Sequence, residues 1–202
     1  MSMVPEIPEF RQRVDRIRGL RDRNLVKIYY LTASRASELI TEISPADLEH
    51  TKPYGTLAKW DLDDYKNEKV LVLKIAILKR KAEEVVLKHI GLPCDPKYEP
   101  WTLDVLRHIK KTRNITFPIV RQSARRVIAK YFPYQEGEKA RKNILRHYRL
   151  THLSSRYGFN AEDIITYAGW TFKGTFKSGQ LDTYLHLDWR KYFDKLLRPL
   201  PQ

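Results

Sequence analysis

The sequence predicts an α+β fold that is mainly α-helical and contains one small β-sheet. Apolar residues recur at helical spacing, as at Leu103, Leu106 and Ile109. By contrast, the stretch 70–77 is short, apolar and rich in Val and Ile, so we expect a strand there and a second strand at 85–90. At 202 residues and 42% hydrophobic content, the chain is long enough for one domain with a substantial core.

Local signals place the other elements. We expect helices at 9–17, 24–30, 102–112, 123–132, 143–153 and 181–197, and a further helix that opens within 31–40. Asn160 and Asp163 have the spacing of a capping box, and Gly169 provides a C-terminal stop, so a short helix joins them. The stretch 55–68 is polar and turn-rich, and its acids complete no calcium loop, so we expect solvated turns and no metal site.

The charge of the chain indicates a polyanionic partner. The net charge is +14, and 105–156 carries +12 of it, because its 14 lysines and arginines face only Glu136 and Glu138. Such a concentration favours nucleic acid over a membrane surface, because these basic helices lack the exposed aromatic face of membrane-binding helices. No apolar run reaches the roughly 18 residues of a membrane span. The lone Cys94 fits a reducing compartment, so we expect a cytoplasmic protein.

The expected helix at 143–153 is the most informative stretch. Asn143 and Arg146 are three residues apart and share a face, and Arg149 lies one further step of three along it. An amide and two guanidiniums that point outward together can bind an anion. A merely solvated basic face is the alternative, and the helix alone does not decide between them.

Several motifs occur in a defined order along the chain. They are Thr-Ala-Ser-Arg35-Ala-Ser-Glu38-Leu, a strand–lysine–strand turn, Asn143-x-Leu-Arg146-His, Ala-Gly-Trp170 and Thr-Tyr184-Leu-His. This order resembles the catalytic domain of the tyrosine recombinases, the phage-type integrases, over residues 24–193. The resemblance implies the catalytic core fold of that family, with the β-hairpin carrying a catalytic lysine.

The resemblance also implies a chemistry and a role for each motif. Arg35 and Arg146 would clamp the scissile phosphate, and Tyr184 would attack it to form a 3′-phosphotyrosine, without metal or nucleotide cofactor. The hairpin lysine would protonate the leaving 5′ oxygen. Lys79 and Lys81 compete for that role; Lys79 is preferred because it precedes the expected second strand at Val85 by six residues.

This chain departs from the family pattern at several of these positions. Asn143 replaces the usual His and can donate a hydrogen bond but cannot shuttle a proton. Trp170 replaces the commoner His, and its indole N–H can still donate to a phosphate. Trp170 and Tyr184 are 14 residues apart, more than the family's usual nine or so. Archaeal viral and plasmid integrases vary at the Asn143 position, so we expect such a source, with the protein near the host nucleoid.

The expected partners follow from the charge and the resemblance. Double-stranded attachment-site DNA is the expected ligand, and its further contacts are expected from Lys81, Arg121, Arg125, Arg126, Lys142 and Arg149. Trp189, Tyr192, Phe193 and Leu196 form one apolar face of the last helix. Family members often dock such a tail onto a neighbour, so we expect a homo-oligomer, a tetramer on DNA, formed through this helix.

The expected layout is a single catalytic domain over 1–202, with a lead-in helix at 1–23 and the core at 24–197. We expect the family's usual N-terminal core-binding domain to be absent. Two other functions stay open at this stage. A type IB topoisomerase shares the chemistry and the core fold but acts without synapsis, and a non-catalytic DNA-binding module would keep the basic face alone.

Overall fold

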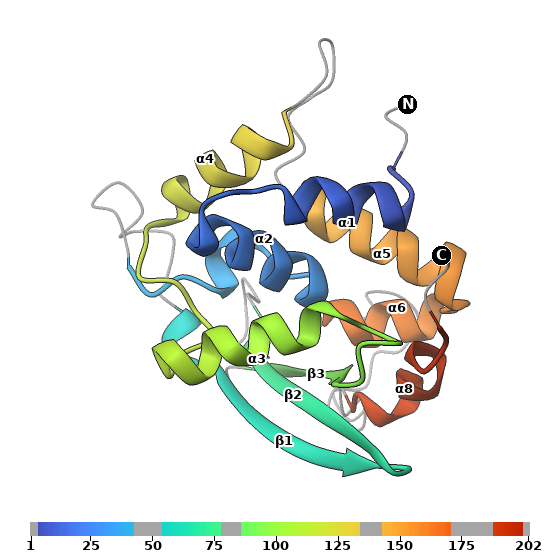
Figure 1. Cartoon of the computed structure of the whole chain (residues 1–202). Coiled ribbons are helices and arrows are strands. Elements are labelled where there is room, and N and C mark those ends of the chain that lie inside the picture. The colour runs from blue at the N-terminus through green and yellow to red at the C-terminus, as the bar shows by residue number, and fades with distance from the viewer. Residues whose placement is uncertain (1–3, 43–53, 78–85, 134–142, 171–187, 200–202) are drawn as a thin grey trace, which may run out of the picture.

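The computed structural model describes residues 4–42, 54–77, 86–133, 143–170 and 188–199. They form a mixed α+β architecture in which helices pack around a small antiparallel sheet (Figure 1). The helices are α1 (Ile7–Asp15), α2 (Leu20–Thr32), α3 (Trp101–Thr112), α4 (Arg121–Tyr131), α5 (Ile144–Tyr157), α6 (Ala161–Ala168) and α8 (Arg190–Leu196), with 3-10 turns η1 (Ala36–Glu38) and η3 (Tyr54–Leu57). The strands are β1 (Lys59–Tyr65), β2 (Glu68–Ala76) and β3 (Leu87–Pro93).

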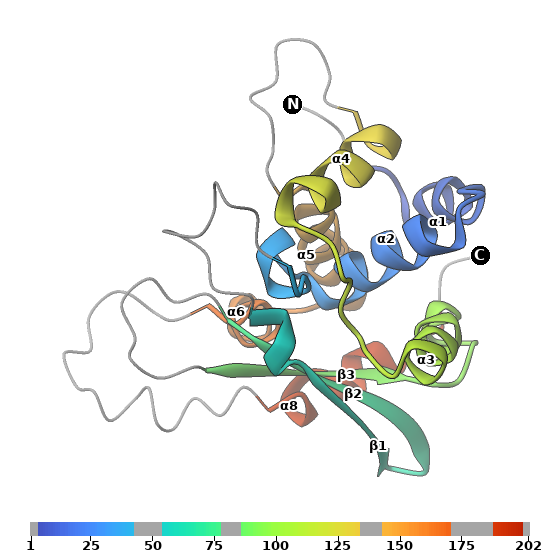
Figure 2. The ribbon, with the colours of Figure 1, turned by 90° about the vertical axis from the view of Figure 1, so that its left-hand side faces the viewer.

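The sheet has the order β1-β2-β3, with β2 in the centre. β2 and β3 pair in the register Leu73↔Ile90, and the apolar side chains of both are buried. Figure 2 shows α2 and α3 above the sheet and α8 below it. At β3, Ile90 and Leu92 are buried on one face of the sheet, and Gly91 packs against the Trp189 ring on the other.

The sequence-based prediction for 55–68 was wrong. Residues 59–65 form strand β1, which pairs with β2 along its whole length. The connecting turn places Lys66 and Asn67 at positive φ, 50° and 66°, as a tight two-residue hairpin requires. Asp61, Asp63 and Asp64 lie on an edge strand with one solvated side, where acidic residues are tolerated and help to prevent pairing with another chain.

An aromatic cluster joins the helices above the sheet. The ring of Phe10 lies within 5.8 Å, centroid to centroid, of the rings of Tyr30, Trp101, Phe132 and Tyr148. These rings come from α1, α2, α3, α5 and the end of α4. The elements that carry the candidate site are thus fixed to one core.

The predicted helix at 160–169 is confirmed. Asn160 accepts a hydrogen bond from the Asp163 amide, the Asp163 carboxylate accepts one from the Asn160 amide, and Gly169 ends α6 at φ 66°. In contrast, the helix expected to open within 31–40 is only the single 3-10 turn η1. None of the described helices combines the length and hydropathy that crossing a lipid bilayer requires.

The apolar face of the last helix packs within this chain. Trp189, Tyr192, Phe193 and Leu196 are all buried, and Trp189 lies directly against Gly91 of β3, where an added Cβ would come within 2.4 Å of the indole. The Tyr192 hydroxyl donates to the carbonyl of His89. The expected oligomer was based on this apolar face. Because the face packs on the protein's own sheet, it gives no support to docking onto a neighbouring molecule.

Candidate active site

Arg35 lies where the chain leaves α2. Ala33 ends that helix in the left-handed region at φ 45°, and Arg35 then caps η1. The Arg35 amide donates to the Glu38 carboxylate at 2.9 Å, and its guanidinium lies 3.5 Å from the same group. Glu38 is buried, whereas the Arg35 side chain is 35% exposed. The carboxylate therefore holds the base of Arg35 while its guanidinium stays accessible to solvent.

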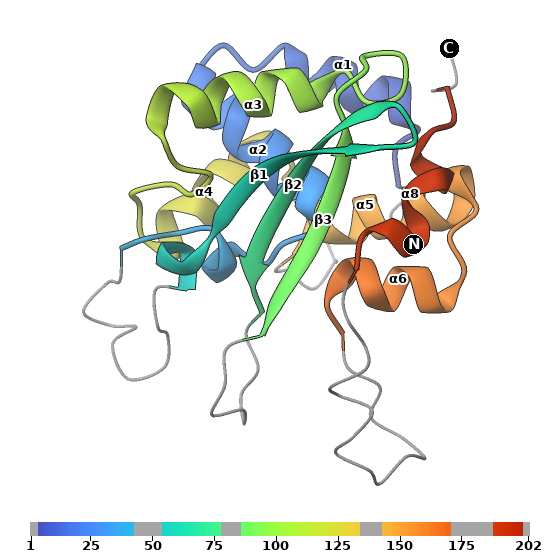
Figure 3. The ribbon, with the colours of Figure 1, turned by 90° about the horizontal axis from the view of Figure 1, so that it is seen from below.

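Arg146 reaches the same region from the first turn of α5. Its guanidinium donates to the carbonyl of Ala33 at 2.9 Å and to the carbonyl of Ala168 at 3.1 Å. These carbonyls belong to the ends of α2 and α6, where helices leave carbonyl groups unpaired. The cation also suits the negative end of each helix dipole. Arg146 therefore joins α5 to the ends of α2 and α6. Figure 3 shows α5, α6 and β3 as neighbouring elements.

Trp170 completes the exposed part of this cluster. The Arg146 guanidinium carbon lies 5.3 Å from the centroid of the Trp170 ring, and Trp170 is 41% exposed. Gly169 just before it has no room for a side chain, because a Cβ would meet Ile77 at 2.5 Å. This close turn positions the indole beside Arg146, so Trp170 and Arg35 are the exposed members of the cluster and Arg146 is the buried one.

Lys88 is a further member of the cluster that the sequence reasoning missed. It lies on β3, is fully buried, donates to the carbonyl of Thr32 at 2.8 Å and lies 3.6 Å from the Glu38 carboxylate. The sequence does carry a signal for Lys88: it alternates with Ile90 and Leu92 along the strand, so it shares their inward face. Lys88 fixes Glu38, and Glu38 fixes Arg35.

The electrostatics of the cluster favour an anion. Three cations, Arg35, Arg146 and Lys88, surround the single carboxylate of Glu38. Burial lowers the pKa of Lys88 to about 8 and that of Arg146 to about 10; in both cases Glu38 opposes the shift and Arg35 adds to it. Lys88 and Arg146 therefore remain protonated at pH 7, so the cluster holds more cations than carboxylates, and a bound phosphodiester would partly offset this excess.

Arg149 does not belong to this site, and its prediction as a DNA contact is wrong. It is only 1% exposed; its Nε donates to the Tyr167 hydroxyl at 3.2 Å and its guanidinium lies 3.6 Å from Glu99. The rings of Tyr30, Tyr157 and Tyr167 surround it. The step of three residues does place Arg149 on the same side of α5 as Arg146, but α2 covers that part of the helix.

The other predicted residues divide into two groups. Asn143 is exposed at the start of α5, one turn before Arg146, and Arg125 and Arg126 are exposed on α4, where Arg121 is half-buried. Lys79, Lys81, Lys142 and Tyr184 lie outside the described residues. The structure thus brings together Arg35, Arg146 and Trp170 from the predicted set with Glu38 of the Arg35 motif, and it adds Lys88.

Comparison of the chain with known protein families, curated proteins and solved structures finds no match. Within the described ranges, no group of three or more His, Cys, Asp or Glu side chains could hold a metal ion.

Proposed function

We propose that this protein cuts and rejoins DNA as a site-specific recombinase, or integrase, of the tyrosine recombinase type. The observation that carries the proposal is the convergence of Arg35, Arg146 and Trp170 on one partly open cationic site. The α+β architecture is compatible with the recombinase catalytic core. The order of motifs in the sequence supplies the rest of the argument.

The two arginines would stabilise charge on the non-bridging oxygens of the scissile phosphate. A guanidinium has five N–H donors; among the described residues Arg146 uses two of them on backbone carbonyls, and further donors would bind the phosphate. Arg35 would approach from the solvent side, and the indole N–H of Trp170 and the amide of Asn143 would add neutral donors. Groups held in place before the reaction stabilise the transition state by several kcal/mol.

In the reaction, the Tyr184 oxygen attacks phosphorus and the bond to the 5′ oxygen breaks. The phenol loses its proton, the DNA 3′ phosphate becomes bound to the tyrosine, and the 5′ oxygen takes a proton from Lys79 or, as the alternative, Lys81. A 5′ hydroxyl then attacks the phosphotyrosine and reverses the step on the same or another strand. Two similar transesterifications therefore conserve the bond energy, so no nucleotide is needed as an energy source, and the cationic side chains would stabilise the charge on the phosphate.

The test is a nicked suicide duplex followed by a denaturing gel and peptide mapping. The short strand that carries the released 5′ hydroxyl diffuses away, so religation is prevented. The wild-type protein should therefore accumulate a covalent adduct in which Tyr184 is bound to the 3′ phosphate. Tyr184→Phe removes one hydroxyl and should abolish the adduct while duplex binding persists; Tyr192→Phe is the matched control and should react normally. Absence of any adduct would favour a non-catalytic DNA-binding module, and relaxation of supercoiled DNA without synapsis would favour a topoisomerase.

A further inference from the structure

The connection between α1 and α2 is dense in arginine and lies outside the candidate active site. Arg13, Arg16, Arg18, Arg21 and Arg23 occur within eleven consecutive residues, 13–23. With Lys111 of α3 and Lys130 of α4, they line two neighbouring hollows on the protein surface. We call these seven residues the connector surface.

One hollow lies between α1 and α4. Arg13, Arg16 and Arg18 line one side of it, and Lys130 and Tyr131 line the other. The Arg13 guanidinium lies 5.7 Å from the Phe132 ring, and Tyr131 donates to Asp22 at the start of α2. These contacts fix the helices beside each other, so the cations border a preformed groove.

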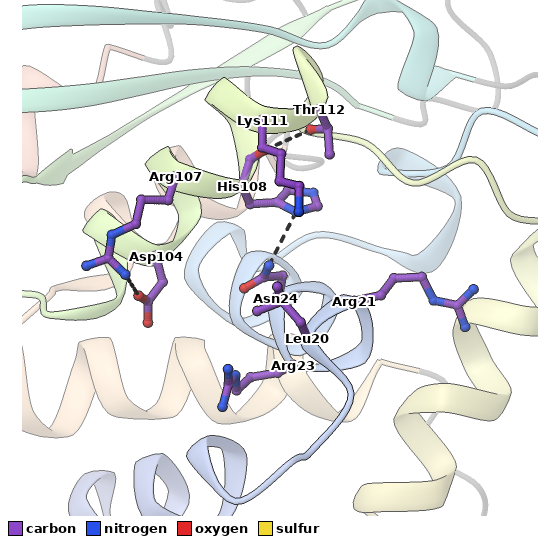
Figure 4. Close-up of a pocket in the computed structure, with 9 residues that line it drawn as sticks. All are labelled: Leu20, Arg21, Arg23, Asn24, Asp104, Arg107, His108, Lys111 and Thr112. Atoms are coloured by element: carbon purple, nitrogen blue, oxygen red, sulfur yellow. Dashed lines mark hydrogen bonds and ion pairs between the residues drawn. The ribbon is translucent and has the colours of Figure 1, made fainter.

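The other hollow lies between α2 and α3 and is drawn in Figure 4. Arg23 and the buried Asn24 come from α2, and His108 and Lys111 come from α3. The Asn24 amide nitrogen lies 3.3 Å from Nδ1 of His108, while Nε2 of His108 is buried without a hydrogen-bond partner in the structure. Burial lowers the pKa of His108, and Lys111 adds to the effect. A neutral His108 that accepts at Nδ1 carries its proton on Nε2, so it offers one more donor.

Much of the positive charge of the connector surface is uncompensated. Arg21 and Arg23 have nearby acceptors, namely the Asp22 carboxylate and the Asp15 carbonyl. The carboxylates of Asp15 and Asp104 both pair with the buried Lys27 instead. Across the parts of the chain that the structure describes, no carboxylate pairs with Arg13, Arg16, Arg18, Lys111 or Lys130. Hollows bordered by unpaired cations are suited to phosphate groups.

Helix α4 connects this surface to the candidate active site. Its first residues contact η1, which follows Arg35, and its last residues border the groove with α1 (Figure 2). Arg125 and Arg126 are exposed between these ends. A nucleic-acid backbone bound at Arg35 therefore meets further cations along α4 before it reaches the connector.

We propose that the connector surface binds the phosphate backbone of duplex DNA, beyond the segment held in the active site. That the bound polymer is DNA rests on the proposed function, whereas the binding of a polyanion rests only on the cations of the connector surface. A membrane surface fits less well, because Leu20 is the only one of the described large exposed hydrophobic side chains that lies at the connector. Binding through phosphates alone also needs no particular base sequence.

The test measures binding of the full chain to duplexes of about 12 and about 40 base pairs across a range of salt concentrations, where the salt slope counts phosphate contacts. The variant is Arg16→Glu with Arg18→Glu, both exposed. The matched control is Lys69→Glu with Lys191→Glu, which reverses two exposed lysines on the hairpin and α8. Thermal unfolding verifies that both proteins fold.

The connector variant should weaken binding of the long duplex about tenfold or more and reduce its salt slope by about 2, with a smaller effect on the short duplex. The control should change either affinity by less than about threefold. Equal effects of variant and control, or equal effects on both lengths, would overturn the proposal. A loss of binding to phosphatidylserine vesicles with unchanged duplex binding would also overturn it, in favour of a membrane contact.

Failure here and failure of the proposed function give different results. Connector-dependent duplex binding without a covalent adduct would support this inference and contradict the recombinase. A covalent adduct on Tyr184, together with duplex binding that is insensitive to Arg16 and Arg18, would support the recombinase and contradict this inference.

Discussion

Two clusters in this protein each place cations around one buried carboxylate, and only one of them has the form of a site. Around Glu38 lie Arg35 and Lys88, with Arg146 close by; around Glu99 lie Arg11 and Arg149. The first cluster opens to solvent through Arg35 and Trp170. The second is closed, because aromatic rings cover Arg149 and Trp101 covers Arg11.

The comparison teaches that a buried cation is not in itself a binding group. In the closed cluster, Arg11 binds Glu99 through two short hydrogen bonds, 2.7 and 2.8 Å, and Arg149 lies 3.6 Å from the same buried carboxylate. In the open cluster, the carboxylate lies 3.5 Å from the Arg35 guanidinium and 3.6 Å from the Lys88 ammonium, and the Arg35 side chain is 35% exposed. We infer that the closed cluster stabilises the fold and that the open cluster binds a phosphate.

The largest expected effect is the difference in unfolding free energy between two variants, each of which lacks the central carboxylate of one cluster. Glu99→Gln should lower the free energy of unfolding by about 3–5 kcal/mol, because it leaves two buried arginines without a counter-charge. Glu38→Gln should cost less, since Lys88 can lose its proton whereas Arg11 and Arg149 cannot. Urea unfolding at pH 7 measures both values. Equal losses would contradict the distinction.

The open cluster should also make stability depend on pH. The folded pKa of Lys88 is about 8, below its ordinary value of 10.5, so between these values the unfolded chain binds more protons. The free energy of unfolding of the wild type, relative to Lys88→Met, should therefore rise from pH 8 to pH 10.5. The expected gain is about 2–4 kcal/mol, as each unit of pKa shift is worth about 1.4 kcal/mol. Parallel pH profiles for the two proteins would show that folding leaves the pKa of Lys88 unchanged, which would contradict this prediction.

A smaller effect is expected at Ala33, which supports Arg35 and Arg146 with its backbone. Its φ of 45° lies in the left-handed region, which is unfavourable for residues with a Cβ. Ala33→Gly should relieve this strain and stabilise the fold by about 0.5–1 kcal/mol, despite the greater flexibility of glycine in the unfolded chain. Thermal unfolding measures the change, and a drop in stability would show that the position is unstrained.

The sequence predicts well those features that are set by neighbouring residues. The helix from Asn160 to Gly169 has both of its ends encoded locally, so it was predicted with its caps. Strand β1 was missed because its acids resemble a solvated turn, and its pairing with β2 is not a local property. Arg149 was misplaced for a related reason. Spacing on a helix shows which residues share a face, but it does not show which other helix covers that face.

The candidate site was predictable in part. The motif order paired Arg35 with Arg146 and Trp170, although periodicity alone does not bring these three segments together. Lys88 was missed because its role depends on the carboxylate of Glu38 in η1, a contact between residues far apart in the chain. Lys79 and Tyr184 remain predictions, since both lie outside the described residues.

The central claim is that the open cluster acts on the phosphate in the transition state and the closed cluster does not. Single-turnover cleavage of a suicide duplex by Arg35→Ala and by Arg149→Met tests it directly, with duplex affinity and the folded fraction measured alongside. Arg35→Ala should retain affinity within about threefold yet cleave about 10² times more slowly, whereas folded Arg149→Met should cleave at the wild-type rate. Wild-type cleavage by Arg35→Ala, or an equal loss in both variants, would contradict the account.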